Sequence, residues 1–154
     1  MEEIIQEALS KGVKMHIAGE FELAGQLYGS VIKLAPDHAD ANHNMGLLKM
    51  DTDFDQEALP YLQTALEADT SIAQFWLSYI KALIKLGRLE DAARVLSLAE
   101  ENGAEGDEFV DLHQRLSEPI NLDEVVVTGT RNSNESKLNI LNTLRLDEAL
   151  SLAR

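Results

Sequence analysis

Acidic side chains are the most concentrated reactive groups in this chain, and one run of them has the spacing of a metal site. Residues 51–57 place carboxylates at alternate positions, as calcium-binding loops do at their start. Such a loop also needs a glycine at its sixth position and a bidentate glutamate at its twelfth, where this chain has Gln56 and Leu62. We therefore interpret the run as an exposed turn whose acids cap the following helix.

Four histidines are the other candidate metal ligands. His16 and His43 are expected near opposite ends of adjacent parallel helices, too far apart to share a zinc ion, while His38 falls in a turn and His113 near the end of the repeated region. The chain has no cysteine, so a thiolate metal site and a disulfide framework are both excluded. We expect no metal and no cofactor.

Residues typical of catalysis do not form a recognisable constellation. The sequence has no nucleophile-elbow glycine pattern, no phosphate-binding loop and no paired catalytic acids. Its glutamates are scattered over outward positions, where a charged side chain mostly keeps a helix face soluble. We predict that these residues do not form an enzyme.

The negative net charge of the chain argues against nucleic acid as a partner. The chain has 27 acidic and 13 basic residues in 154, a net charge of −14, whereas nucleic-acid binding needs a basic surface. The first residues lack the basic region and apolar run of a signal peptide, and no stretch is as long as a membrane span. We expect a cytoplasmic protein that neither binds nucleic acid nor inserts in a membrane.

The elements that must position these side chains are helices. Apolar residues recur every three or four positions, for example at Trp76, Tyr79 and Leu83 before Gly87, and at Leu89 and Leu96 after it. The same pattern predicts helices over about 3–18, 20–34, 39–50 and 55–68, a pair joined at residues 86–88, and a further helix over 107–117.

These helices form a repeat with a period of 34 residues. Three alanines follow one another at this step, and so do three large residues and two of the glycines: Ala24, Ala58 and Ala92; Tyr28, Leu62 and Leu96; Gly12 and Gly46. Small residues are expected where helices approach closely, and large residues where a gap must be filled. The period therefore predicts a stacked helical array.

With Trp76 early in one copy and Pro36 closing another, this pattern resembles the tetratricopeptide repeat family. The resemblance implies an all-α fold, a solenoid of antiparallel helix pairs, in a domain over residues 1–118. Its repeats would cover about 5–38, 39–72 and 73–106, with a C-terminal capping helix at 107–117.

Residues 119–154 have a different character from the repeats. We expect a linker over 119–136 with an extended segment at its β-branched run, and an additional helix over 137–154. That helix reaches Arg154 without a stop signal, which suggests a piece of a longer protein.

The family resemblance also implies a concave groove lined by the first helix of each pair. In the family's register, the groove residues of this chain are Leu9, Val13, His16, His43, Asn44, Leu47, Met50, Gln74, Leu77, Lys81, Ile84 and Lys85. Family members that bind chaperone tails hold a carboxylate with a clamp of five polar residues. Of the five matching positions here, only Asn44 fits, so a clamp of that kind is not expected.

The resemblance implies a non-catalytic scaffold that binds a protein or peptide partner in this groove. Aliphatic residues beside Lys81 and Lys85 suit an amphipathic helix or a mostly apolar segment with an acidic group. Three alternatives remain open. Residues 120–154 would themselves occupy the groove, the tail would join copies into a homo-oligomer, or the chain would be the N-terminal accessory domain of a larger bacterial enzyme such as a glycosyltransferase or sulfotransferase.

Overall fold

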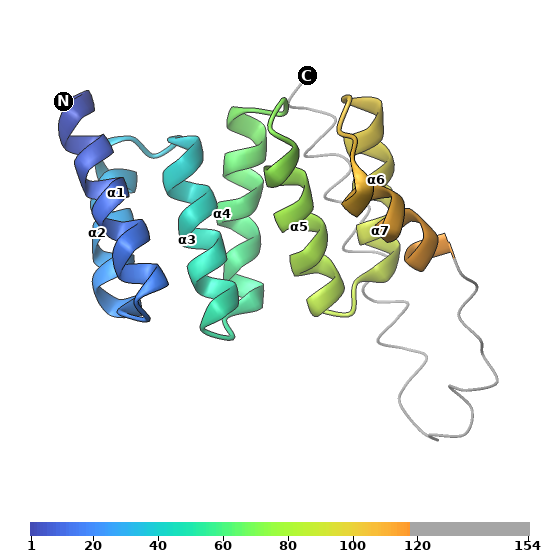
Figure 1. The fold of residues 1–154 in the computed structure, drawn as a ribbon, viewed down its shortest axis with the longest axis horizontal. Helices are drawn as coiled ribbons and strands as arrows, with labels where there is room; N and C mark the ends of the chain where they lie inside the picture. Colours follow the sequence, from blue (N-terminus) through green and yellow to red (C-terminus); the bar gives the residue numbers. More distant parts are fainter. Residues whose placement is uncertain (118–154) are drawn as a thin grey trace.

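A computed structural model describes residues 1–117, and these residues form seven helices and no strand (Figure 1). The helices are α1 (Glu2–Ile17), α2 (Phe21–Leu34), α3 (Ala39–Asp51), α4 (Asp55–Ala68), α5 (Ala73–Lys85), α6 (Leu89–Glu101) and α7 (Asp107–Ser117). The all-α class expected from the apolar periodicity is confirmed for this part of the chain.

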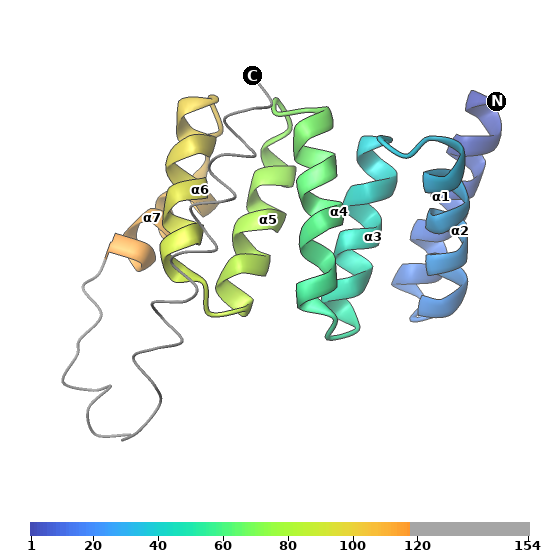
Figure 2. The ribbon, with the colours of Figure 1, turned by 180° about the vertical axis from the view of Figure 1, so that it is seen from behind.

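The helices pack on their neighbours in chain order, α1 on α2, α2 on α3, and so on to α7. They form two layers. Figure 1 shows α1, α3, α5 and α7 in front, and Figure 2 shows α2, α4 and α6 from behind. We call these the first layer and the second layer. The residues 34 apart in sequence therefore take equivalent places along one layer.

Tight turns separate successive helices, both within a pair and between pairs. Gly87 ends the α5–α6 turn with φ of +74°, a conformation that costs glycine little and other residues more. The turn before α5 is fixed differently, because the indole Nε1–H of Trp76 donates to the carbonyl of Thr70 at 2.8 Å. Both turns reverse the chain within a few residues, so successive helices are antiparallel.

The repeated small residues mark close approaches between helices. Ala24, Ala58 and Ala92 are fully buried. A Cβ atom on Gly46 would lie 2.5 Å from Cδ2 of Leu62, and one on Gly12 would lie 2.6 Å from Cε1 of Tyr28. The sequence prediction that these positions must be small is confirmed.

The C-terminal part of the array is closed by α7. Phe109 and Leu112 of α7 are both 3% exposed and belong to the hydrophobic core that α4, α5 and α6 share. A second core joins α1, α2 and α3. The last repeat therefore does not expose its apolar face on the side that α7 covers.

The predicted linker over 119–136 and the predicted helix over 137–154 lie outside the described residues. The division into domain, linker and tail helix stays a prediction. No helix within residues 1–117 has the length and apolar character that crossing a membrane requires.

Candidate functional site

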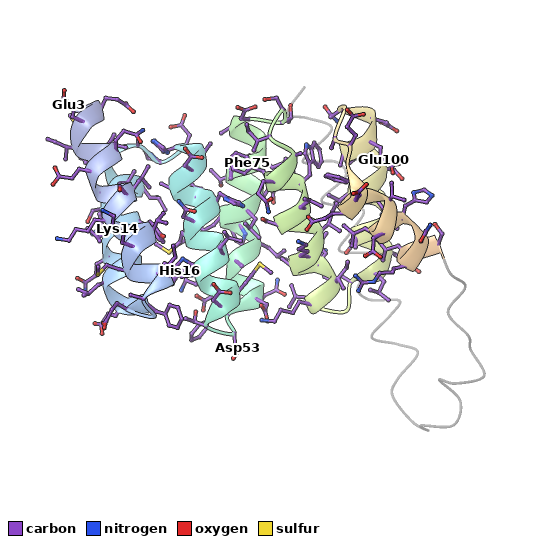
Figure 3. All side chains as sticks on the ribbon, in the orientation of Figure 1. Glu3, Lys14, His16, Asp53, Phe75 and Glu100 are labelled. Atoms are coloured by element: carbon purple, nitrogen blue, oxygen red, sulfur yellow. The ribbon has the colours of Figure 1, made fainter. Side chains whose placement is uncertain are left out.

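Polar contacts link the first-layer helices to one another at a constant sequence offset. His16 Nε2 of α1, a residue labelled in Figure 3, lies 2.8 Å from Asp51 Oδ2 of α3. His43 Nε2 of α3 lies 2.8 Å from Ser78 Oγ of α5. Both contacts join residues 35 positions apart. The two histidines are therefore engaged in separate contacts between repeats and do not form a joint metal site.

The acidic turn that resembled a calcium loop binds a lysine of the next repeat. Lys85 Nζ donates to the carbonyl of Met50 at 2.9 Å and lies 2.9 Å from Asp55 Oδ1 and 3.4 Å from Asp53 Oδ1. The hydrogen bond to Asp55 is the main reason why the pKa of Lys85 is raised. Two of the acidic residues in this turn are thus paired with a lysine of the next repeat.

His43 and Ser78 form a buried pair on the inner side of α3 and α5. Their exposed fractions are 7% and 2%, and the imidazole also packs on Phe75 with the ring centroids 4.7 Å apart. Burial lowers the pKa of His43, opposed by the charge of Asp40, so the imidazole is neutral at pH 7. Because the Ser78 hydroxyl is inaccessible, we interpret this pair as a structural link between repeats and not as a nucleophile with its base.

A pocket of about 660 Å³ lies between α5 and α7. Ile84 of α5 and Leu112 of α7 supply apolar surface, and Lys81 is the most exposed of the α5 lysines that line it. Lys81 Nζ lies 3.5 Å from Glu108 Oε2, with both side chains about half exposed. We call this hollow the α5–α7 pocket.

The twelve residues expected to line the groove divide into three groups by burial. Val13, Gln74, Lys81 and Lys85 are exposed; His16, Asn44, Leu47, Met50 and Ile84 are half-buried; Leu9, His43 and Leu77 are buried. Lys81, Ile84 and Lys85 are brought together in the α5–α7 pocket. The three buried side chains pack inside the array and present little surface to a partner.

The α7 residues that line the α5–α7 pocket are not among the groove residues expected from the sequence. Asp107, Glu108, Asp111, Leu112 and Arg115 line this pocket. A signal existed, because residues 107, 111 and 115 recur every four positions and share one face of a helix. The sequence predicts only a capping role for this helix, so its polar residues are missing from the expected groove.

The remaining histidines have local partners. The His38 ring accepts a hydrogen bond from the backbone N–H of Ala41 at 3.3 Å and so caps α3. His113 Nδ1 lies 3.4 Å from Glu100 Oε1. Within residues 1–117, no group of three or more histidine, aspartate or glutamate side chains is placed to hold a metal ion.

Comparison with known proteins gives a family match and a set of similar folds. The family model for the tetratricopeptide repeat matches residues 56–116. No curated protein matches the chain. Among solved structures, the tetratricopeptide domain of Arabidopsis OM64 is similar with a TM-score of 0.68 and 20% identity, covering 77% of this chain and 98% of that one.

Two further structures are similar over much of the array. The TPR2B domain of yeast Sti1, solved as a complex with pHsp70, has a TM-score of 0.67 and 22% identity over 74% of this chain and 96% of that chain. A mutant O-GlcNAc transferase from Thermobaculum terrenum has a TM-score of 0.61 and 24% identity, over 66% of this chain but only 19% of the transferase. At these identities the similarity establishes the fold alone.

Proposed function

We propose that this chain, whose residues 56–116 match the tetratricopeptide repeat family and whose fold is that of tetratricopeptide domains, is a non-catalytic scaffold whose first layer binds a segment of a partner protein. The observation that carries the proposal is the α5–α7 pocket, a hollow of about 660 Å³ that combines apolar surface with a weakly paired lysine. The yeast Sti1 domain, similar in fold, is one whose structure was solved with a bound partner.

Lys81 is the residue best suited to contact an acidic group of the partner. Its ion pair with Glu108 is 3.5 Å long and joins side chains that are 48% and 61% exposed, so exchanging Glu108 for a partner carboxylate costs little. Lys85, in contrast, is held by the carbonyl of Met50 and by Asp55. We therefore assign the acidic contact to Lys81 and a positioning role to Lys85.

Apolar contacts would supply most of the binding energy. Ile84 is half-buried and lies beside Leu112 in the pocket, while Val13, farther along the first layer, is 36% exposed. A partner helix with apolar residues three or four positions apart would bury them against these side chains. The predicted partner segment is thus an amphipathic helix with one acidic residue near its apolar face.

Selection of displayed random peptides against the full chain tests this proposal. The expected peptides carry apolar residues at helical spacing and an acid, and they bind the Lys11→Glu variant but lose affinity for Lys81→Glu. Lys11 is exposed on α1, on the opposite side of that helix from Leu9 and Val13, and gives the same change of charge. Equal binding to both variants would argue against the α5–α7 pocket.

A second function is favoured by the similarity to the Thermobaculum transferase. There the matching part is 19% of a larger enzyme, so we also propose that this array serves as the accessory or oligomerisation domain of a longer polypeptide. Detection of the protein in source cells distinguishes the two proposals. A polypeptide of about 17 kDa would contradict the accessory role, and a much larger one would support it.

A further inference from the structure

The second layer contains a groove that the proposed function does not use. A hollow of about 760 Å³ lies between α2 and α4, with α3 beneath it. Most of its lining residues belong to α2 of the second layer, the layer seen in Figure 2, whereas the α5–α7 pocket is lined by first-layer helices. Met45 and Leu48 form its floor, and we call it the back groove.

The back groove is open where two glycines stand on the face of α2 that borders it. Phe21, Gly25, Gly29 and Lys33 are spaced four residues apart and lie along one face of α2. One repeat later, Leu59 stands at the position of Gly25 and is 7% exposed. A Cβ atom on Gly25 would lie 3.3 Å from Leu48 Cδ2, a tight contact, whereas one on Gly29 would meet nothing closer than Met45 Cε at 3.8 Å. The face of α2 is therefore open at Gly29, while at Gly25 a side chain would need Leu48 to shift slightly.

Aromatic side chains border this open space. Phe21 is 38% exposed and Phe54 is 53% exposed, and both line the back groove together with the half-buried Tyr61. When a partner covers an exposed aromatic ring, the ring's apolar area is removed from water. This burial stabilises the complex by roughly several hundred cal/mol to a few kcal/mol for each ring. The groove therefore favours an apolar occupant.

The charges along the back groove favour an occupant that is acidic at one end. The ammonium group of Lys33 makes no ion pair or hydrogen bond with any described residue, whereas that of Lys49 lies 2.7 Å from Glu57 Oε2 and 5.2 Å from the centroid of the Phe54 ring. Phe21 and Lys33 are twelve residues apart on α2, which is about 18 Å along a helix. The occupant should thus be apolar at one end and acidic at the other.

We propose that residues 137–154 of the same chain lie in the back groove as a helix. This sequence has Leu141 and Leu144 followed by Asp147 and Glu148. From Leu138 to Glu148 is ten residues, about 15 Å of helix, which approaches the spacing from Phe21 to Lys33. Leucines would then cover the aromatic end, and the acids would reach Lys33.

The length of chain between α7 and this segment permits the placement. Residues 118–136 supply nineteen residues, which span at most about 63 Å when extended. Neighbouring helices pack about 10 Å apart, so the segment can pass from α7 to α2 along the array. This docking leaves the α5–α7 pocket accessible, so the proposal does not depend on the proposed function.

Cross-linking of the full chain tests the placement. Because the chain has no cysteine, the pair Ser30→Cys and Leu144→Cys can be joined by a short bismaleimide without background. Ser30 lines the back groove, and Gln74→Cys with the same tail cysteine is the control on the first layer. We expect an intramolecular cross-link at least tenfold more abundant with Ser30→Cys than with Gln74→Cys.

Two further variants make the test specific. Gly29→Leu fills the groove with a residue favourable to helices and should lower the yield at least fivefold while helicity by circular dichroism is kept. Lys33→Glu should lower the yield, and adding Asp147→Lys with Glu148→Lys should restore it. A restored yield cannot be explained by misfolding of the single variant.

Three outcomes would contradict the placement of residues 137–154 in the back groove. Cross-links that join two chains would replace the proposal by a second copy as the occupant. Equal yields at Ser30→Cys and Gln74→Cys, or no effect of Gly29→Leu, would overturn it.

Discussion

At the scale of single residues, the contacts between repeats are polar and differ in strength. Lys85 is bound by three oxygens of the α3–α4 turn, whereas Lys81 has one long and exposed ion pair. His43 and Ser78 satisfy each other inside the array. Individual substitutions should therefore separate the residues that hold the array together from those free to bind a partner.

The two lysines provide a matched pair. We expect Lys85→Met to lower the melting temperature, because it leaves the 16%-exposed carboxylate of Asp55 without its cation. Lys81→Met removes an exposed pair and should leave the melting temperature nearly unchanged. Differential scanning calorimetry of both variants measures the difference. Equal effects would show that the acidic turn does not depend on Lys85.

The neutral, buried His43 makes stability depend on pH. Its pKa is lowered in the folded protein, so on acidification the unfolded chain binds the proton first. The stabilising contribution is complete above the unfolded pKa of about 6.5 and is lost as the pH falls below it. A His43→Gln variant can keep the hydrogen bond to Ser78 without titrating.

We therefore expect the free energy of unfolding to fall more in the wild type than in His43→Gln between pH 7 and pH 5, by up to about 1 kcal/mol. Urea unfolding at each pH measures this difference, and the other histidines cancel because both proteins contain them. Parallel pH profiles would contradict the assignment of a neutral, buried imidazole.

At the scale of elements, glycines have two different roles. Gly46 allows two helices to approach closely, whereas Gly29 borders open space in the back groove. On Gly46 a Cβ atom would press on the fully buried Leu62, whereas on Gly29 it would make an ordinary contact. Gly46→Ala should destabilise the fold by about 1 kcal/mol, because an overpacking cost of about 1–3 kcal/mol exceeds the gain in helix propensity. Gly29→Ala should stabilise it by about 0.5–1 kcal/mol. Chemical unfolding of both variants tests the contrast, and stabilisation by Gly46→Ala would refute the close approach.

The elements were largely predictable from the sequence, and the site was not. The apolar periodicity and the 34-residue step predict the helices to within about two residues, because one repeat unit must bury the same face each time. Burial of Leu9, His43 and Leu77 depends on how the next helix packs, which a register alone does not specify. The capture of Lys85 by the acidic turn joins residues more than 30 apart and needed the three-dimensional structure.

At the scale of the whole molecule, acidic charge is the dominant feature. Residues 1–117 contain 21 acidic and 9 basic residues, so like charges repel over the described surface. We expect the melting temperature to rise when sodium chloride is increased from low to near-physiological concentration, because salt screens this repulsion. A fall over the same range, measured by calorimetry, would show that the surface ion pairs outweigh the repulsion.

Titration calorimetry tests most directly whether the first layer binds a partner through the α5–α7 pocket. The peptide selected most strongly by the full chain is titrated into the wild type, Lys81→Glu and Lys11→Glu. Reversal of a charge-assisted contact predicts a Kd at least about tenfold weaker for Lys81→Glu, equivalent to about 1.4 kcal/mol, and an unchanged Kd for Lys11→Glu. The same Kd for all three proteins would contradict the account.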